Sequence, residues 1–148
     1  MVYTVGEMAK RLGVAPSTLR FYDKEGLLPF VERSNGGVRV FKEADYEWLM
    51  IIECLKKTGM PLRDIKVFIE MAIEGDDTID KRLALIRNQK ASIERQIAEL
   101  SEIQKVLEFK EWYYTTAKES GSTSVPRNMP LDELPEEYRE IRLKLRGN

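Results

Sequence analysis

Aromatic and basic side chains lie next to one another in a short stretch near the N-terminus. The segment from residue 16 to residue 24 reads PSTLRFYDK and contains Arg20, Phe21, Tyr22 and Lys24. Arginine and lysine form charge-assisted hydrogen bonds with phosphate oxygens, and such contacts fix a protein on a DNA duplex. Binding of nucleic acid is therefore the chemistry that these residue types favour.

The charge of the N-terminal part of the chain supports this interpretation. Residues 1–42 carry seven basic and four acidic side chains, a net charge of +3, although the whole chain of 148 residues has a net charge of −1. Phosphate contacts act within a Debye length of about 8–10 Å. A local basic face on a near-neutral protein can therefore still bind DNA.

Two short helices with a tight turn between them position this stretch. Thr4 and Glu7 have the spacing of a capping box, which starts a first helix, and Gly13 suits the left-handed conformation that often ends one. Pro16 fits the first turn of a second helix, and Gly26 is placed to stop that helix. Two short helices joined in this way predict a DNA-reading helix-turn-helix.

A hairpin is expected directly after the second helix. Short apolar runs flank the sequence SNGG at residues 34–37, which tolerates positive φ angles and marks a hairpin turn. Arg33 and Arg39 stand on its two arms. A surface hairpin without a function is one interpretation, and a basic wing laid along DNA phosphates is the other. The helix-turn-helix immediately before it favours the wing.

Two further helical patterns complete the N-terminal domain. Apolar spacing predicts a third helix from Lys42 to Thr58, and a fourth that begins after Pro61 and closes at Gly75. We expect the buried face of the fourth helix to contain Ile65, Phe68, Ile69, Ala72 and Ile73. The fold class predicted for the chain is mainly α, and residues 1–75 form a domain of four helices and a two-stranded β-hairpin.

Residues 76–116 have the pattern of a long dimerisation helix. From Thr78 to Tyr114 there is no glycine or proline, and large apolar residues recur every seven positions. This spacing is that of a coiled-coil seam. We expect the dimer interface to contain Ile79, Leu83, Ile86, Ile93, Ile97, Leu100, Leu107 and Tyr114. The alternative is a helix packed on its own domain, but so long a stripe favours a homodimer.

Residues 117–148 are expected to form a linker and a short amphipathic helix. The stretch from Ala117 to Pro130 is rich in Ser, Gly, Thr and Pro, which is typical of a linker. Beyond it an apolar stripe has helical spacing and consists of Leu134, Tyr138, Ile141 and Leu145. The sequence leaves open whether this helix folds back on its own dimer or meets another partner.

Residues 1 to about 115 resemble the MerR family of bacterial transcription regulators. The resemblance rests on VGEMAKRLGVAPSTLRFYDKEGLL, on GGVRVF in the hairpin and on LKKTGMPLRDI before the fourth helix. It implies a winged helix-turn-helix joined to an antiparallel coiled coil that forms the dimer. It also implies binding to promoter DNA between the −35 and −10 elements, which the protein distorts so that RNA polymerase can use the promoter.

The resemblance also assigns DNA contacts by position. On the second helix and the wing these are Ser17, Thr18, Arg20, Phe21, Tyr22 and Arg39. Additional phosphate contacts are expected at Lys24, Arg33, Lys56 and Lys66. Phe21 stands where the family often has a tyrosine, and it lacks the hydroxyl that would bind a phosphate.

The cysteine and histidine content narrows the choice of signal. The chain has no histidine and one cysteine, Cys54, so thiolate or imidazole metal sites and iron–sulfur clusters are not expected, and neither is any cofactor. Cys54 resembles the single cysteine of the aldehyde- and electrophile-responsive branch of the family, which implies that its alkylation or oxidation is the signal. Two alternatives remain: Cys54 is a buried structural residue, or a small apolar or cationic ligand binds beside Trp112, Tyr113 and Tyr114.

Other functional classes have less support. No histidine, nucleophile motif or phosphate-binding glycine loop indicates an enzyme. An architectural DNA-binding or recombination factor and a coiled-coil adaptor stay as alternatives, although the long seam argues against the first. No signal peptide and no apolar run long enough for a bilayer is present, so we expect a cytoplasmic protein without a membrane partner.

Overall fold

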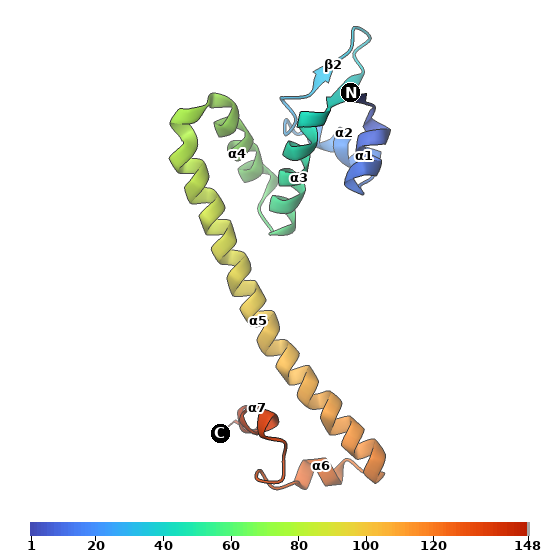
Figure 1. Ribbon diagram of the computed structural model, residues 1–148, viewed down its shortest axis with the longest axis vertical. Coiled ribbons are helices and arrows are strands. Elements are labelled where there is room, and N and C mark those ends of the chain that lie inside the picture. The colour runs from blue at the N-terminus through green and yellow to red at the C-terminus, as the bar shows by residue number, and fades with distance from the viewer. Residues whose placement is uncertain (148) are drawn as a thin grey trace. The chain divides into compact units, whose positions relative to one another are not determined.

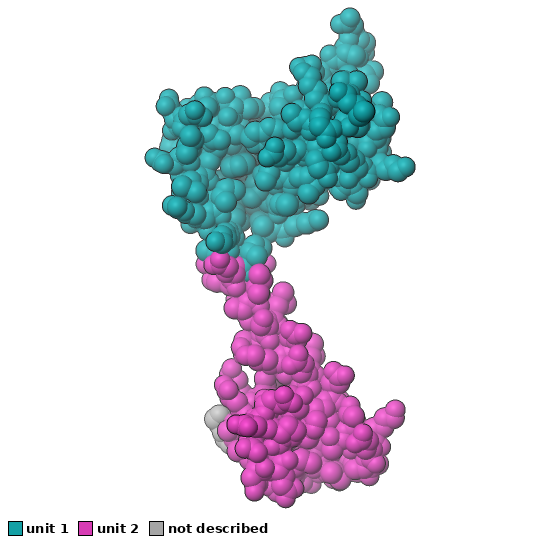
Figure 2. Space-filling model, viewed as in Figure 1, with its two compact units in different colours: residues 1–93 teal, residues 94–148 magenta. Residues whose placement is uncertain are grey.

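The computed structural model describes residues 1–147 and is mainly helical (Figure 1). The helices are α1 (Val5–Leu12), α2 (Pro16–Lys24), α3 (Glu43–Lys57), α4 (Leu62–Glu74), α5 (Ile79–Ser120), α6 (Ser124–Asn128) and α7 (Glu136–Leu145). A short 3₁₀ helix, η1 (Asp76–Thr78), precedes α5, and the strands are β1 (Val2–Tyr3), β2 (Glu32–Arg33) and β3 (Arg39–Lys42). The chain forms two compact units, residues 1–93 and residues 94–148, and α5 contributes to both (Figure 2).

Local signals at the start of the chain determine the helix-turn-helix, as predicted. The Glu7 carboxylate accepts a hydrogen bond from the Thr4 amide at 2.8 Å, and the Thr4 hydroxyl oxygen accepts one from the Glu7 amide at 3.3 Å. This capping box satisfies two backbone donors that the helix itself leaves unpaired. Gly13 ends α1 with φ +71°, a conformation that side-chain-bearing residues avoid, and Pro16 is the first residue of α2.

The hairpin belongs to a sheet of three strands, one more than predicted. β3 lies between β1 and β2 and pairs antiparallel with both. Tyr3 lies opposite Phe41, and Arg33 lies opposite Arg39. β1 was not predicted, because a strand of two residues is too short to show the alternation by which strands are recognised.

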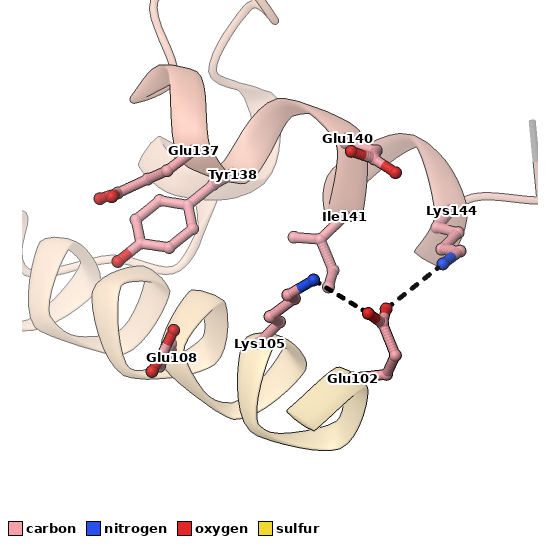
Figure 3. A pocket seen from close by; sticks show the side chains of 8 residues that line it. All are labelled: Glu102, Lys105, Glu108, Glu137, Tyr138, Glu140, Ile141 and Lys144. Carbon is pink, nitrogen blue, oxygen red and sulfur yellow. Dashed lines mark hydrogen bonds and ion pairs between the residues drawn. The ribbon is translucent and has the colours of Figure 1, made fainter. Parts of the chain in front are cut away.

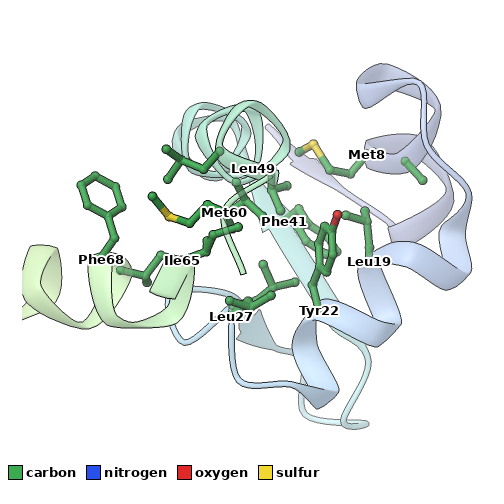
Figure 4. Close-up of a cluster of buried hydrophobic side chains, with 14 residues drawn as sticks. Met8, Leu19, Tyr22, Leu27, Phe41, Leu49, Met60, Ile65 and Phe68 are labelled. Carbon is green, nitrogen blue, oxygen red and sulfur yellow. The ribbon is translucent and has the colours of Figure 1, made fainter. Parts of the chain in front are cut away.

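One apolar core holds the elements of the first unit together (Figure 4). The largest side chains fully enclosed in it are Met8, Leu19, Tyr22, Leu27, Phe41, Leu49, Ile52, Ile65 and Ile69. They come from α1, α2, the segment after α2, β3, α3 and α4. The predicted buried face of α4 is correct for Ile65, Phe68 and Ile69, but Ile73 is 57% exposed because the last turn of α4 extends beyond this core.

The predicted linker is wrong. α5 continues to Ser120, and residues 124–128 form α6, in which Pro126 is buried. Proline is compatible with this short helix because Pro126 lies in its first turn, where the helix makes no backbone bond to the residue's nitrogen. The Ser122 hydroxyl oxygen accepts a hydrogen bond from the Ser124 amide at 3.1 Å and so helps to start the helix.

The second unit has a core of its own. Phe109 and Tyr113 of α5 pack with Leu134 and with Ile141 of α7, so α7 folds back on the end of α5 in the same chain. Trp112 stacks against Phe109, with ring centroids 5.9 Å apart. Phe109, Trp112 and Tyr113 therefore serve mainly to pack this unit, whereas Tyr114 is 59% exposed.

We predict that Leu134→Ala destabilises the second unit by about 2–5 kcal/mol, because the leucine is 1% exposed and its removal leaves a cavity. Hydrogen exchange of the amides in α6 and α7 measures the effect. Leu131→Ala is the matched control, since Leu131 is 41% exposed and its truncation should change stability by less than about 0.5 kcal/mol. Equal effects of the two variants would contradict the described packing.

Candidate nucleic-acid interface

One face of α2 lines the core and the other is open to solvent. Leu19 and Tyr22, three positions apart, are fully buried, which leaves the intervening residues on the outer face. Among the predicted DNA contacts on α2, Ser17, Arg20, Phe21 and Lys24 are exposed and Thr18 is half-buried. Phe21 is 45% exposed. Its ring is therefore available to a partner, although it lacks a hydroxyl.

Tyr22 differs from the other predicted contacts because its side chain is enclosed. Its hydroxyl donates a hydrogen bond to Glu53 Oε1 at 2.5 Å, and Lys56 Nζ donates one to the same hydroxyl at 3.0 Å. Burial, together with the bond to Glu53, raises the pKa of Tyr22, so the phenol stays protonated. Its position does not support the expectation of a direct DNA contact, and the structure instead uses Tyr22 to join α2 to α3.

Asp23 fastens the hairpin to α2. Its Oδ2 accepts hydrogen bonds from Arg33 Nη2 and from Arg39 Nε, each at 2.7 Å. Arg33 also donates to the carbonyl oxygen of Gly37 at 2.9 Å, within the turn of the hairpin. The two predicted wing contacts are thus brought together beside α2. Asp23 was not among the predicted site residues, because nothing in the local pattern shows that it meets residues ten and sixteen positions further on.

A second missed cluster holds the start of the chain in place. Arg11 Nη1 donates to Glu43 Oε2 at 2.8 Å, and the Tyr3 hydroxyl donates to the same oxygen at 2.6 Å. The Arg11 guanidinium also stacks over the Tyr46 ring, 4.1 Å from its centroid. The bonds from Arg11 and Tyr3 lower the pKa of Glu43 to about 2. This cluster joins β1, α1 and α3 and so orients the helix-turn-helix.

The remaining predicted phosphate contacts lie on α3 and α4. Lys56 is exposed but bonded to Tyr22, as described above. Lys66 is half-buried, and its ammonium lies against the turn that ends α2, 3.1 Å from the place of a Cβ atom on Gly26. A side chain at Gly26 would therefore displace Lys66, and the φ of +76° there also favours glycine.

Cys54 is exposed on α3. The alternative of a buried structural cysteine is therefore not supported within a single chain. Its sequence neighbour Glu53 accepts the bond from Tyr22, and Lys56 donates to the same tyrosine. Cys54 thus lies on the stretch of α3 that is bonded to α2.

The predicted dimer seam is largely exposed on α5. Ile93 is half-buried. The other seam residues are between 39% and 65% exposed, and they are Ile79, Leu83, Ile86, Ile97, Leu100, Leu107 and Tyr114. Within residues 1–147, no cluster of three potential metal ligands occurs, and no helix has the length and hydropathy needed to cross a bilayer.

Models of two protein families match the chain. The model described as MerR HTH family regulatory protein matches residues 3–72, and the one described as MerR, DNA binding matches residues 46–108. The first contains α1, α2 and the hairpin, and the second extends along α5. The matches therefore contain all of the predicted DNA contacts and every predicted seam residue except Tyr114.

Individual relatives agree with these models. An HTH-type transcriptional regulator of Haemophilus influenzae is 48% identical over 136 residues, which are 92% of this chain and 98% of that protein. The crystal structure of HiNmlR, a MerR family regulator lacking the sensor domain, bound to promoter DNA, is 49% identical with a TM-score of 0.77 and covers 84% of this chain and 98% of its own. A MerR family regulator from Bacillus thuringiensis is 42% identical, with a TM-score of 0.69, and covers 74% of this chain and 96% of its own.

These relatives are transcriptional regulators and not enzymes, in agreement with the motifs that the sequence lacks. Their likeness extends over the helix-turn-helix, the hairpin and most of the chain that follows. The chain belongs to the MerR family of DNA-binding transcriptional regulators.

Proposed function

We propose that the protein acts as a homodimer that binds promoter DNA between the −35 and −10 elements and distorts it so that RNA polymerase can use the promoter. The observation that carries this proposal is the exposed seam on α5, in a regulator whose relative HiNmlR is bound to promoter DNA. A dimer with two DNA-binding units can grip both sides of distorted central base pairs, which is what recognition through DNA deformation requires. Such a function places the protein in the cytoplasm.

Dimerisation follows from the cost of leaving the seam in water. Apolar side chains such as Leu100 and Leu107 are 65% and 63% exposed in the single chain. Burial of apolar surface is the main favourable term in association, at roughly 25 cal/mol per Å². A second α5, antiparallel as the family resemblance implies, offers the same stripe and would cover it along its whole length. Ala84 and Ala91 are small enough to let that helix approach closely.

In this proposal α2 and the wing make the DNA contacts. Ser17, Thr18 and Arg20 lie at the start and on the open side of α2 and supply hydrogen-bond donors, whereas Phe21 supplies an apolar contact. Arg33 and Arg39 bind phosphates from the wing, with orientations fixed by Asp23. Lys24, Lys56 and Lys66 add charge at the end of α2 and beside it, and Tyr22 contributes indirectly by anchoring the helix.

Cys54 is the candidate sensor for an aldehyde or another electrophile. HiNmlR lacks a sensor domain and this chain covers 98% of it, which favours a signal received within the shared part. The Cys54 thiolate would add to the aldehyde carbonyl carbon, and the resulting alkoxide would take up a proton to give a hemithioacetal, so no oxidant is needed. A change beside Glu53 then acts on the bond to Tyr22 and so on α2. Phe109 and Tyr113 are buried in the core of the second unit, so a signal carried by an apolar or cationic ligand packed on their rings is less favoured than one received at Cys54.

Footprinting on the DNA upstream of the protein's own gene tests the dimeric promoter-binding function. The wild-type protein should protect two half-sites between the promoter elements. Leu100→Asp places a charge in the seam and should abolish both the dimer, measured by sedimentation, and the protection. Ser101→Asp is the control, because it puts the same charge about 100° further around the helix. Protection by a monomeric Leu100→Asp variant would refute the dimeric mode.

Arg39→Ala tests the wing. We expect weaker binding to all DNA sequences alike, because a phosphate contact carries no base information, and a salt dependence of log K lowered by about one unit. Gel shifts over a range of salt concentrations give the slope. Arg87→Ala, which removes an exposed arginine from α5, should leave the slope unchanged. A wild-type slope in Arg39→Ala would exclude the wing as a phosphate contact.

Cys54→Ser tests the sensor. Treatment of the wild-type protein with formaldehyde should modify Cys54, detected by mass spectrometry, and alter the footprint. The serine variant has nearly the same size and a far weaker nucleophile, so it should bind the promoter normally and fail to respond. If the variant responds like the wild type, the signal is received elsewhere.

A further inference from the structure

A basic pocket lies in the second unit, where the end of α5 meets α6 and α7. Its volume is about 370 Å³, which is within the range of small-molecule sites. Its lining contains four cationic side chains and no carboxylate, and consists of Phe109, Lys110, Tyr113, Tyr114, Arg127, Arg142, Leu145 and Arg146. The wall is thus partly aromatic, and all of its charges have one sign.

Arg142 is the most unusual member of this basic pocket because it is 4% exposed. Its Nη2 donates to the carbonyl oxygen of Pro126 at 2.6 Å, and its guanidinium lies over the Phe109 ring, 5.4 Å from the centroid. Carbonyl groups satisfy some of its hydrogen-bond donors, but they do not neutralise its charge. A buried cation without an anion is costly. Burial and the neighbouring Arg146 accordingly lower its pKa.

The other cations of the basic pocket also lack an acidic partner. Arg146 Nη2 donates to the carbonyl oxygen of Arg127 at 2.6 Å, and Lys110 Nζ lies over the Tyr113 ring at 4.7 Å from its centroid. Within residues 1–147, no carboxylate pairs with Lys110, Arg127, Arg142 or Arg146. Four positive charges therefore converge on one hollow without compensation.

A second groove lies between α5 and α7, and its lining contains both acidic and basic side chains (Figure 3). There Glu102 Oε1 accepts a hydrogen bond from Lys105 at 2.9 Å, and its Oε2 lies 3.7 Å from Lys144 Nζ. The lysines of this groove thus have a carboxylate beside them, and Glu108, Glu137 and Glu140 also line it. A lining with cations and no carboxylate, as in the basic pocket, is therefore not a general property of the grooves beside α7.

We propose that the basic pocket binds a small organic anion, a carboxylate or phosphate carried on an aromatic or aliphatic body. The anionic group would meet the guanidinium groups of Arg142 and Arg146 and the ammonium of Lys110, because arginine matches the geometry of carboxylate and phosphate oxygens. The body would pack on Tyr114, which is 59% exposed, and on Leu145, which is 50% exposed. This site would add ligand recognition to the DNA-binding function and is independent of Cys54.

Calorimetric titration of the 148-residue chain with phenyl phosphate tests the proposal. We expect phenyl phosphate to bind more tightly than inorganic phosphate, because only the former covers the aromatic wall, and benzyltrimethylammonium not to bind. In Lys110→Gln/Arg146→Gln the affinity for phenyl phosphate should fall about tenfold or more, since two charge-assisted contacts are lost. Lys110→Gln alone removes a side chain that contacts aromatic rings but forms no hydrogen bond within residues 1–147. We therefore expect a smaller fall in affinity and little change in melting temperature.

The matched control is Lys105→Gln/Lys144→Gln, which removes the same number of charges from the second groove and should bind phenyl phosphate like the wild type. Arg39→Ala should also bind it normally, which distinguishes the basic pocket from the DNA-binding face. The proposal is overturned if phenyl phosphate does not bind, or if it binds equally well to the Lys110→Gln/Arg146→Gln variant. An affinity lost in Arg39→Ala would likewise overturn it.

Discussion

The hydrogen bond between the buried Tyr22 hydroxyl and Glu53 links two elements of the first unit that matter for the proposed function. It joins α2, which carries most of the proposed DNA contacts, to α3, which carries Cys54. Because Tyr22 is fully buried, a loss of the partner of its hydroxyl would cost free energy. α2 therefore cannot move away from α3 without the loss of this bond. The orientation of the DNA-binding helix and the state of α3 near Glu53 are consequently linked.

The exposed apolar seam on α5 is a second constraint, because it favours association of α5 with another helix. The buried residues of α5 are Phe109, Tyr113 and Ala117, all near its C-terminal end. Further toward its N-terminus, the helix presents large apolar side chains to solvent. Local propensity does not hold so long a helix in that state, since most helical stability in proteins comes from packing of an amphipathic face. A partner of the same length and pattern removes this difficulty, and a second copy of the chain is such a partner.

The features that sequence reasoning predicted correctly are those with local causes. The capping box of Thr4 and Glu7, the turn at Gly13 and the unbroken pattern of α5 each depend on residues a few positions apart. The features it missed depend on distant partners. Asp23 meets Arg39 sixteen positions later, and β1 exists only because β3 is available to pair with it. The composition of residues 117–130 suggested a linker, but contacts with α5 and α7 override that composition.

Tyr22 shows why residue type alone is not enough to identify a DNA contact. A tyrosine between basic residues on a DNA-reading helix fits a phosphate contact, yet its spacing from Leu19 directs it into the core. The same distinction separates the two basic regions of the chain. At the wing, Arg33 and Arg39 share Asp23 and keep part of their surface in water. Their charges therefore cost the free protein little stability. In the basic pocket Arg142 is 4% exposed and pairs with no carboxylate among residues 1–147, so the energetic reason for binding an anion is stronger there.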